Sequence, residues 1–213
     1  MQMEMEVVLR GPFPMPRDDS PPPPSSGATE LAGQSLGASQ ADREETKQRV
    51  IKALRYFPDW PTPGVNFIDI LPIFQDPKIF ESLLQVLELQ IRDSFDTLPD
   101  VIVGLDARGF LFGPPLGPAP QLLLRPGPQD GQDARREYGE DFFQMQVDAI
   151  KPGQKVLVVD DIIATGGSAA AAGSLVSQLG GSLMGYLFLI EISFLAGRAK
   201  LGDVPILTLV EEK

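Results

Sequence analysis

The stretch VLVVDDIIATGGS, from Val156 to Ser168, decides the expected fold. Its apolar half predicts a buried strand that ends in two adjacent acids, Asp160 and Asp161. The small residues from Ala164 to Ser168 then lead into a helix that is expected to extend to Leu179. An apolar strand followed by a turn and a helix is the repeating unit of α/β proteins, so this stretch predicts such a sheet.

The composition of the loop from Ala164 to Ser168 favours the binding of an anion. Gly166 and Gly167 allow the backbone to approach a ligand closely, and successive N–H groups at a helix N-terminus attract negative charge. Thr165 and Ser168 add hydroxyl donors. The alternative is a purely structural turn that caps the helix. The full order of strand, acid pair, loop and helix is more specific than the loop alone.

Two carboxylates beside a phosphate site would repel the ligand unless they face hydroxyl groups or a cation. A sugar phosphate with free ribose hydroxyls and a bound Mg²⁺ supplies both partners, so a phosphoribosyl compound is the expected ligand. The loop is not a Walker loop, because the chain contains no GxxxxGK[ST] pattern, and it does not read GxGxxG.

The rest of the chain alternates between helices and strands. Two amphipathic helices are expected, over residues 42–57 and 76–95, with an ordered proline-rich loop over 58–74 between them. One face of the first helix is apolar and contains Val50, Ile51, Leu54 and Phe57. Apolar runs predict strands over 101–106, 155–160, 182–192 and 205–210. Together these elements predict a mostly parallel, doubly wound sheet that binds its ligand at the carboxyl ends of the strands.

The composition excludes several kinds of chemistry. The 213 residues include neither Cys nor His, which excludes disulfides, Cys/His zinc sites, Ser-His-Asp triads and thiolate nucleophiles. The formal net charge of −11 argues against a nucleic-acid-binding or anionic-membrane surface. No signal peptide or membrane span is expected, so a cytoplasmic protein is the default expectation.

Prolines gather in two places along the chain. Seven of the 21 prolines lie between Pro12 and Pro24, among Ser and Gly residues, and predict a disordered arm over residues 1–40, followed by one domain over 41–213. The run from Pro21 to Pro24 favours polyproline II and is a conceivable site for an SH3-like partner, although a passive tail is the simpler interpretation. Six further prolines lie between Pro114 and Pro128.

Three segments carry a resemblance to a known family. VLVVDDIIATGGS resembles the diphosphoribosyl-binding signature of type I phosphoribosyltransferases. FPDWPTPGVNFIDILPIF, residues 57–74, and GLDARGFLFGPPL, residues 104–116, resemble the FPDFPTPG-x-x-F-x-DI-x-P and GLDSRGFLFGP segments of adenine phosphoribosyltransferases. EYG, from Glu137 to Gly139, and KPGQKVLVVDD continue the likeness, which covers about residues 45–213.

The resemblance implies a type I phosphoribosyltransferase fold, in which helices flank a mostly parallel twisted sheet and a small hood or lid covers the site. It implies a glycosyltransferase of purine salvage, which converts adenine and phosphoribosyl pyrophosphate into AMP and pyrophosphate. It also implies Mg²⁺ as the cofactor and a cytoplasmic homodimer. Adenine, phosphoribosyl pyrophosphate and AMP are then the expected partners, with no nucleic acid and no membrane among them.

Position by position, the resemblance assigns residues to the sugar and the phosphates. Asp160 and Asp161 would contact the ribose hydroxyls, directly or through the metal that the substrate carries, and Asp161 is an expected catalytic residue. Arg108 would reach the pyrophosphate or help to order its site. The 5′-phosphate would be held by five consecutive residues: Ala164, Thr165, Gly166, Gly167 and Ser168.

The resemblance also assigns residues to the base. Phe67 would stack on adenine, with backbone groups of Asn66 at the edge of the base. Glu137 and Tyr138 would lie on the lid, and Glu137, near the base, would be the second catalytic residue. Without the resemblance, a core position for Phe67 and a solvated loop position for Glu137 are the simpler interpretations.

The chain departs from the family pattern in three places. Ile68 stands where the family has an Arg, so a basic group near the base pocket is absent. The Lys residues of a basic family loop are missing from residues 125–136, where Arg125 can stand for the first base. Three prolines would break the helix that normally follows GFLFG: Pro115, Pro118 and Pro120. An extended connector, a deletion or a spliced junction would each explain this last departure.

These departures leave two alternatives to a catalytic adenine phosphoribosyltransferase. A non-catalytic paralogue would keep the fold and bind a nucleotide or a partner protein. A type I transferase for another base would use the same loop with a pocket altered by Ile68. The acid pair and the intact loop favour the enzyme, whereas the missing lysines favour the paralogue.

Overall fold

A seven-stranded sheet forms the centre of the structure, a computed structural model that describes residues 7–10, 40–60, 63–64, 66–116, 121–126, 143–146 and 148–212. The strands follow the order β1-β6-β5-β4-β7-β8-β9 across the sheet. Five neighbouring strands are parallel: β5 (Gln121–Pro126), β4 (Val101–Leu105), β7 (Lys155–Ile163), β8 (Ser182–Ile192) and β9 (Ile206–Glu212). β6 (Phe143–Gln146) pairs antiparallel with β5 and parallel with β1 (Val7–Arg10). The expected mostly parallel sheet is therefore confirmed.

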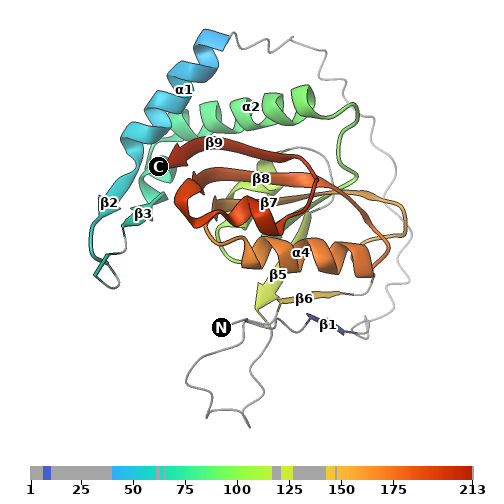
Figure 1. Cartoon of the computed structure of the whole chain (residues 1–213). Coiled ribbons are helices and arrows are strands. Elements are labelled where there is room, and N and C mark those ends of the chain that lie inside the picture. The colour runs from blue at the N-terminus through green and yellow to red at the C-terminus, as the bar shows by residue number, and fades with distance from the viewer. Residues whose placement is uncertain are drawn as a thin grey trace, which may run out of the picture.

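Helices cover both faces of this sheet, as Figure 1 shows. α1 (Gln40–Ala53) and α2 (Pro77–Ser94) lie on one face, and α4 (Gly167–Gln178) lies on the other. Short helical segments connect the described strands: α3 (Gly109–Phe112), η1 (Leu71–Gln75), η2 (Pro114–Leu116), η3 (Ser193–Leu195) and η4 (Gly197–Lys200). No described helix is long and apolar enough to cross a membrane.

α2 begins and ends within one residue of the range that its periodicity predicts. Asp76 caps its N-terminus, because the carboxylate accepts a hydrogen bond from the backbone N–H of Lys78 at 2.9 Å. Pro77 occupies the first turn, where its missing N–H leaves no hydrogen bond unmade. The buried face of α2 consists of Leu83, Val86, Leu87 and Ile91.

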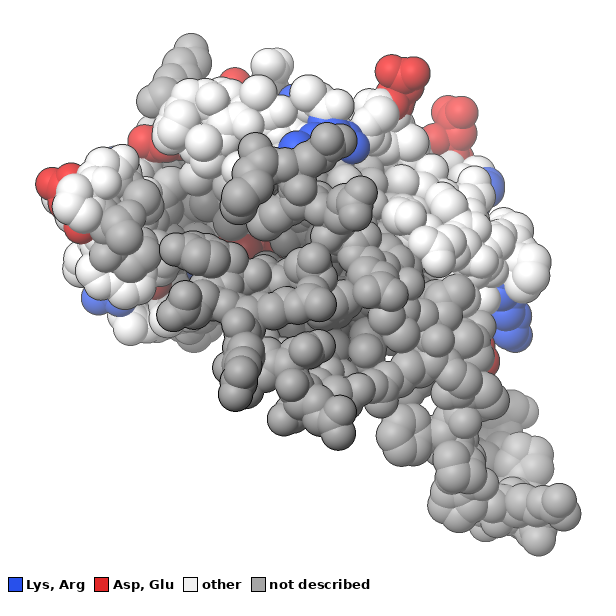
Figure 2. All heavy atoms as spheres, turned by 60° about the horizontal axis from the view of Figure 1, so that its bottom comes forward, with Lys and Arg blue, Asp and Glu red and all other residues white. Residues whose placement is uncertain are grey.

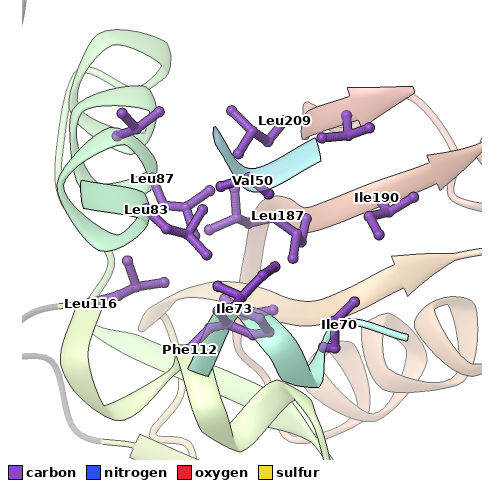
Figure 3. Packing of buried hydrophobic residues seen from close by; sticks show 14 of the residues in the cluster. Val50, Ile70, Ile73, Leu83, Leu87, Phe112, Leu116, Leu187, Ile190 and Leu209 are labelled. Atoms are coloured by element: carbon purple, nitrogen blue, oxygen red, sulfur yellow. The ribbon is translucent and has the colours of Figure 1, made fainter. Parts of the chain in front are cut away.

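The sheet divides the core into two layers. Successive residues of a strand face opposite sides, so Leu157 and Val159 of β7 join the layer under α1 and α2, whereas Val156 and Val158 join the layer under α4. A central strand segment that is buried on both faces is expected to be apolar throughout, as β7 is from Val156 to Val159. Figure 3 labels ten residues of the first layer: Val50, Ile70, Ile73, Leu83, Leu87, Phe112, Leu116, Leu187, Ile190 and Leu209.

A separate two-stranded hairpin lies where the sequence pattern predicts the end of a helix and a loop. β2 (Arg55–Phe57) and β3 (Phe67–Asp69) pair antiparallel, with Tyr56 opposite Ile68. The prediction that the first helix continues to Phe57 is therefore wrong, since α1 ends at Ala53. A residue before proline is disfavoured in helical conformation, and Phe57 precedes Pro58. In the hairpin the backbone of β2 is extended, and its polar groups pair with β3 instead of continuing the helix.

The proline clusters lie largely outside the described residues. Within residues 1–40 the structure describes β1, a strand paired with β6, and the first residue of α1, so the disordered arm stays a prediction for the remainder. Within GFLFG, α3 ends at Phe112, and a 3₁₀ turn over Pro114–Leu116 follows the segment. A long helix at this place is thus absent from the described residues, in agreement with the proline spacing.

Replacing Leu87 by Ala tests the packing of α2 on the sheet. Leu87 is 1% exposed, so we expect the free energy of unfolding to fall by about 2–5 kcal/mol in urea denaturation. Leu98→Ala is the matched control, because this leucine is 46% exposed and its loss is expected to cost less than about 0.5 kcal/mol. Equal losses in the two variants would contradict the assigned core.

Candidate functional site

The carboxyl ends of three neighbouring strands meet at one edge of the sheet. β4 ends at Leu105, β7 ends at Ile163 and β8 ends at Ile192, and β7 pairs parallel with both of the others. Parallel strands direct their carboxyl ends to the same edge, so the segments that follow them gather there. The candidate site consists of the turn after β4, the loop after β7 and the acid pair Asp160 and Asp161.

Asp160 and Asp161 belong to β7 and do not follow it, because the strand continues to Ile163. The side chain of Asp161 is almost fully buried and that of Asp160 is half-buried. The backbone N–H of Asp161 donates a hydrogen bond to Oδ1 of Asp160 at 2.9 Å. The buried strand therefore holds two carboxylates side by side at the sheet edge.

Arg108 provides the opposite charge for this pair. It follows β4 in the turn from Asp106 to Arg108, which contains a cis peptide bond between Asp106 and Ala107. Its Nε lies 3.0 Å from Oδ2 of Asp161, and its side chain remains 43% exposed. One flank of the guanidinium thus binds the buried carboxylate while the side chain stays open to a ligand.

The electrostatic state of the pair follows from its burial. Desolvation, followed by the neighbouring charge of Asp161, raises the pKa of Asp160 from its ordinary value of 3.8 to about 8. Desolvation also raises the pKa of Asp161, and the charge of Arg108 opposes this rise. The pair therefore retains a proton near neutral pH, and a cation or hydroxyl donors at this edge would favour the fully ionised form.

The loop from Ala164 to Gly166 has the geometry of an anion site at a helix N-terminus. Gly166 is the N-cap of α4 and adopts a left-handed conformation with φ of 76°, which favours glycine. The first helical hydrogen bond runs from the N–H of Ala170 to the carbonyl of Gly166 at 3.0 Å, so the preceding N–H groups are not used within the helix. Thr165 and Ser168 are exposed beside them.

The structure places Phe67 and Asn66 on the β2–β3 hairpin. Phe67 is half-buried and makes an edge contact with Trp60, with ring centroids 4.6 Å apart, and Asn66 is exposed. The Tyr56 hydroxyl lies 3.4 Å from Oε2 of Glu212, the last residue of β9. Since β9 is parallel to β7 and β8, this contact places the hairpin at the same edge of the sheet (Figure 1).

Ile68 occupies the core rather than a surface that faces the base pocket. Its side chain is 5% exposed and belongs to the apolar layer under α1 and α2. Phe67 and Asp69, its neighbours in β3, face the other side of the strand, because strand side chains alternate. The departure from the family at this position therefore changes packing beneath the hairpin.

The structure thus brings together Arg108, Asp160, Asp161 and the loop over 164–168, and it places Phe67 and Asn66 on a hairpin at the same edge. Glu137, Tyr138 and the segment 127–142 lie outside the described residues, so their roles stay predictions. On the face shown in Figure 2, Lys and Arg side chains of the described residues lie at separate places among Asp and Glu side chains.

Sequence reasoning missed the segment after β8, which contacts the loop over 164–168 through Gly197. A methyl group on Gly197 would overlap the carbonyl oxygen of Ala164, and one on Gly166 would overlap the carbonyl oxygen of Gly197. The backbones of the two segments are therefore in close contact. The signal available in the sequence for this segment was Glu191, a charged residue near the end of an otherwise uncharged strand.

The donor set at this edge fits a cation that arrives with a ligand. Within the described residues no group of three or more His, Cys, Asp or Glu side chains could hold a metal ion. The two carboxylates of Asp160 and Asp161 remain, and Mg²⁺ is commonly bound by one or two carboxylates together with substrate oxygens. A substrate-borne Mg²⁺ is therefore compatible with the residues present.

Comparison with known proteins finds similarity over most of the chain. Residues 74–199 match the family described as the phosphoribosyl transferase domain. The adenine phosphoribosyltransferase of Yarrowia lipolytica is 52% identical over 167 residues, which cover 74% of this chain and 92% of the relative. That of Rattus norvegicus is 42% identical over 178 residues, covering 79% and 98%.

A solved structure extends the similarity to three dimensions. The adenine phosphoribosyltransferase of Saccharomyces cerevisiae, complexed with an imino-altritol bisphosphate and adenine, is 42% identical to this chain. The superposition has a TM-score of 0.71 and covers 78% of this chain and 99% of the solved chain. The doubly wound sheet is thus a known architecture.

The proton held by Asp160 predicts a pH-dependent stability. Because the folded chain retains this proton up to about pH 8 and the unfolded chain loses it near pH 4, the folded state binds more protons between these values. The free energy of unfolding contributed by Asp160 therefore falls as the pH rises. We expect Asp160→Asn to gain stability relative to the wild type between about pH 5 and pH 8 in urea denaturation.

The control for this comparison is Asp203→Asn, the same chemical change on an exposed loop. Its stability relative to the wild type should stay constant over the same pH range. A constant difference for Asp160→Asn as well would show that the folded state does not hold the proton.

Proposed function

Since this chain belongs to the phosphoribosyltransferase family, and its relatives at 42–52% identity are adenine phosphoribosyltransferases, we propose that it transfers the phosphoribosyl group of phosphoribosyl pyrophosphate to adenine. The products are AMP and pyrophosphate, so the reaction is one of purine salvage. The observation that carries this proposal is the junction of the Arg108–Asp161 ion pair, the Asp160 carboxylate and the loop over 164–168 at one sheet edge.

The residues of the sheet edge bind and orient the sugar phosphate. Backbone N–H groups from Ala164 to Ser168 and the hydroxyls of Thr165 and Ser168 hold the 5′-phosphate at the N-terminus of α4. Asp160 and Asp161 accept hydrogen bonds from the ribose hydroxyls. Holding both ends of the sugar fixes the anomeric carbon for attack, which replaces a large entropic cost by prior binding.

Arg108 serves the leaving group. Its Nε is bound to Asp161, which fixes the position of the guanidinium, and its exposed part is free to donate to pyrophosphate oxygens. Negative charge accumulates on the pyrophosphate as its bond to the anomeric carbon breaks. A cationic donor that is already in place stabilises this charge without having to reorganise.

The hairpin and the lid serve the base. Phe67 stacks on adenine, backbone groups of Asn66 bind the base edge, and Trp60 supports the ring of Phe67 from its edge. A bond forms between a ring nitrogen of adenine and the anomeric carbon while the bond to pyrophosphate breaks. The proton on that nitrogen passes to a carboxylate, for which the resemblance proposes Glu137, with Tyr138 beside it on the lid.

Asp160 and Asp161 are the residues that would hold Mg²⁺, through the ribose hydroxyls and the pyrophosphate of the substrate. When bound, the ion neutralises phosphate charge and draws electrons from the leaving group. The raised pKa of Asp160 supports this arrangement, because such a carboxylate gains from a nearby cation or hydroxyl donor. A homodimer and a cytoplasmic location complete the proposal and rest on the resemblance.

The reaction is tested by incubating the protein with adenine, phosphoribosyl pyrophosphate and Mg²⁺ and measuring AMP. We expect AMP to form and expect its formation to stop when a chelator removes Mg²⁺. Binding of AMP without any AMP formation would overturn the enzyme and support the non-catalytic paralogue. Formation of a nucleotide from another purine or pyrimidine base, but none from adenine, would instead support a transferase of different specificity.

The double substitution Asp160→Asn and Asp161→Asn tests the role of the acid pair. We expect the Kd for phosphoribosyl pyrophosphate with Mg²⁺ to rise by about tenfold to a hundredfold in calorimetry, because each carboxylate makes charge-assisted contacts. The control Asp203→Asn, on an exposed loop, should bind like the wild type. A variant that retains its circular dichroism spectrum and the wild-type Kd would contradict the site assignment.

A further inference from the structure

Glu191 and Arg198 form an ion pair with two hydrogen bonds, next to the segment that contacts the loop over 164–168. Glu191 is the penultimate residue of β8, and its side chain is 10% exposed. Arg198 donates from Nε to Oε1 and from Nη2 to Oε2, both at 2.6 Å. A bidentate pair with one buried partner is held far more firmly than an exposed surface pair. The side chain of Arg198 therefore has a defined position.

Two further hydrogen bonds attach Arg198 to the next strand. Its Nη1 donates to the carbonyl oxygen of Ile206 and its Nη2 donates to the hydroxyl of Thr208, both at 3.1 Å. Both acceptors belong to β9, which pairs with β8. The guanidinium thus joins two strands through its fixed fork of donors, a geometry that a lysine ammonium does not reproduce.

The residue before Arg198 is the one that contacts the loop. Gly197 lies so close to the loop that an added methyl group would overlap the carbonyl oxygen of Ala164 and lie 2.9 Å from the backbone nitrogen of Gly166. In return, a methyl group on Gly166 would overlap Gly197. The two backbones leave each other no room, so a shift of Gly197 requires a shift of the loop.

From these contacts we infer that Glu191 and Arg198 are positioning residues for the 5′-phosphate site. The ion pair fixes Arg198 on β8 and β9, the adjacent Gly197 follows, and the loop from Ala164 to Gly166 is pressed into the shape that directs its N–H groups to one anion. Neither side chain belongs to the loop or to the acid pair. The inference rests on the proposed function, because it assumes that the loop binds a phosphate.

A displacement of the loop by a fraction of an ångström weakens all of its phosphate contacts at once, because they share one backbone. Loss of the ion pair should therefore weaken phosphate binding more than adenine binding. A merely structural ion pair would behave differently. Its loss would lower the thermal midpoint and leave the affinity of the folded protein for either ligand unchanged.

The experiment measures AMP binding by calorimetry for the wild type, Arg198→Lys and Glu191→Gln, at a temperature where each variant is folded. We expect the Kd for AMP to rise by about tenfold in both variants. In steady-state kinetics the KM for phosphoribosyl pyrophosphate should rise by a similar factor, while the KM for adenine stays within about twofold. Arg198→Lys retains the charge, so the loss reports the bidentate geometry.

Two further variants separate the contact from the ion pair. Gly197→Ala leaves Glu191 and Arg198 in place but inserts a methyl group against Ala164, and it should reproduce the loss of AMP affinity. Arg92→Lys is the control for the same substitution in an exposed ion pair, because Nε and Nη2 of Arg92 both donate to Oε1 of Glu88 on the surface of α2. It should bind AMP like the wild type.

Failure of this inference differs from failure of the proposed function. Wild-type affinity for AMP in Arg198→Lys and Glu191→Gln would overturn the inference, whatever the thermal midpoints show. Absence of AMP formation by the wild type would overturn the proposed reaction alone, since binding is measured without turnover. A selective loss of AMP affinity in Arg198→Lys, Glu191→Gln and Gly197→Ala, with Arg92→Lys unchanged, would support the inference.

Discussion

The central strand β7 is buried on both faces and nevertheless contains two adjacent carboxylates near its carboxyl end. Its residues from Val156 to Val159 contribute to both core layers. Asp160 and Asp161 follow them near the end of the strand, at the edge of the sheet. Adjacent carboxylates in a buried position lose hydration and also repel each other, which raises the pKa of Asp160 so that it holds a proton. The structure offsets this cost with Arg108, drawn from the turn after the neighbouring strand. The arrangement of the whole edge follows from this requirement.

The edge is assembled from segments that are distant along the chain and close in space. β4 contributes Arg108, β7 contributes the acid pair and the loop, and the segment after β8 contributes Gly197. Glycine is needed at Gly166 and Gly197, because the backbones touch there and a side chain at either position would separate them. The absence of Cys and His is consistent with this arrangement, since the edge consists of backbone amides, hydroxyls, carboxylates and one guanidinium.

The departures from the family differ in their consequences for this edge. Ile68 lies in the core under the hairpin, so its effect on the base runs through the packing of β3 rather than through a lost charge in the pocket. Of the prolines after GFLFG, the structure describes Pro114 and Pro115, which lie in a 3₁₀ turn directly after α3, and this turn leaves β4 and Arg108 in place. The acid pair and the loop over 164–168, on which the proposed reaction depends, are retained in the sequence, and the structure places them together at the sheet edge.

Local sequence determined the parts of this protein that depend on neighbours along the chain. The periodicity of α2, the apolar run of β7 and the small residues of the loop each specify an element, because burial and backbone freedom have a local pattern. The family motifs likewise predicted Arg108, Asp160 and Asp161 as site residues, and the structure brings these three residues together. The end of α1 was misjudged, since the pairing of β2 with a strand ten residues further on competes with helix continuation. Only the tertiary structure decided that Arg108 binds Asp161, that Ile68 turns inward and that Gly197 supports the loop. These contacts depend on which strands are neighbours and in which register, and no local pattern of residues encodes that choice.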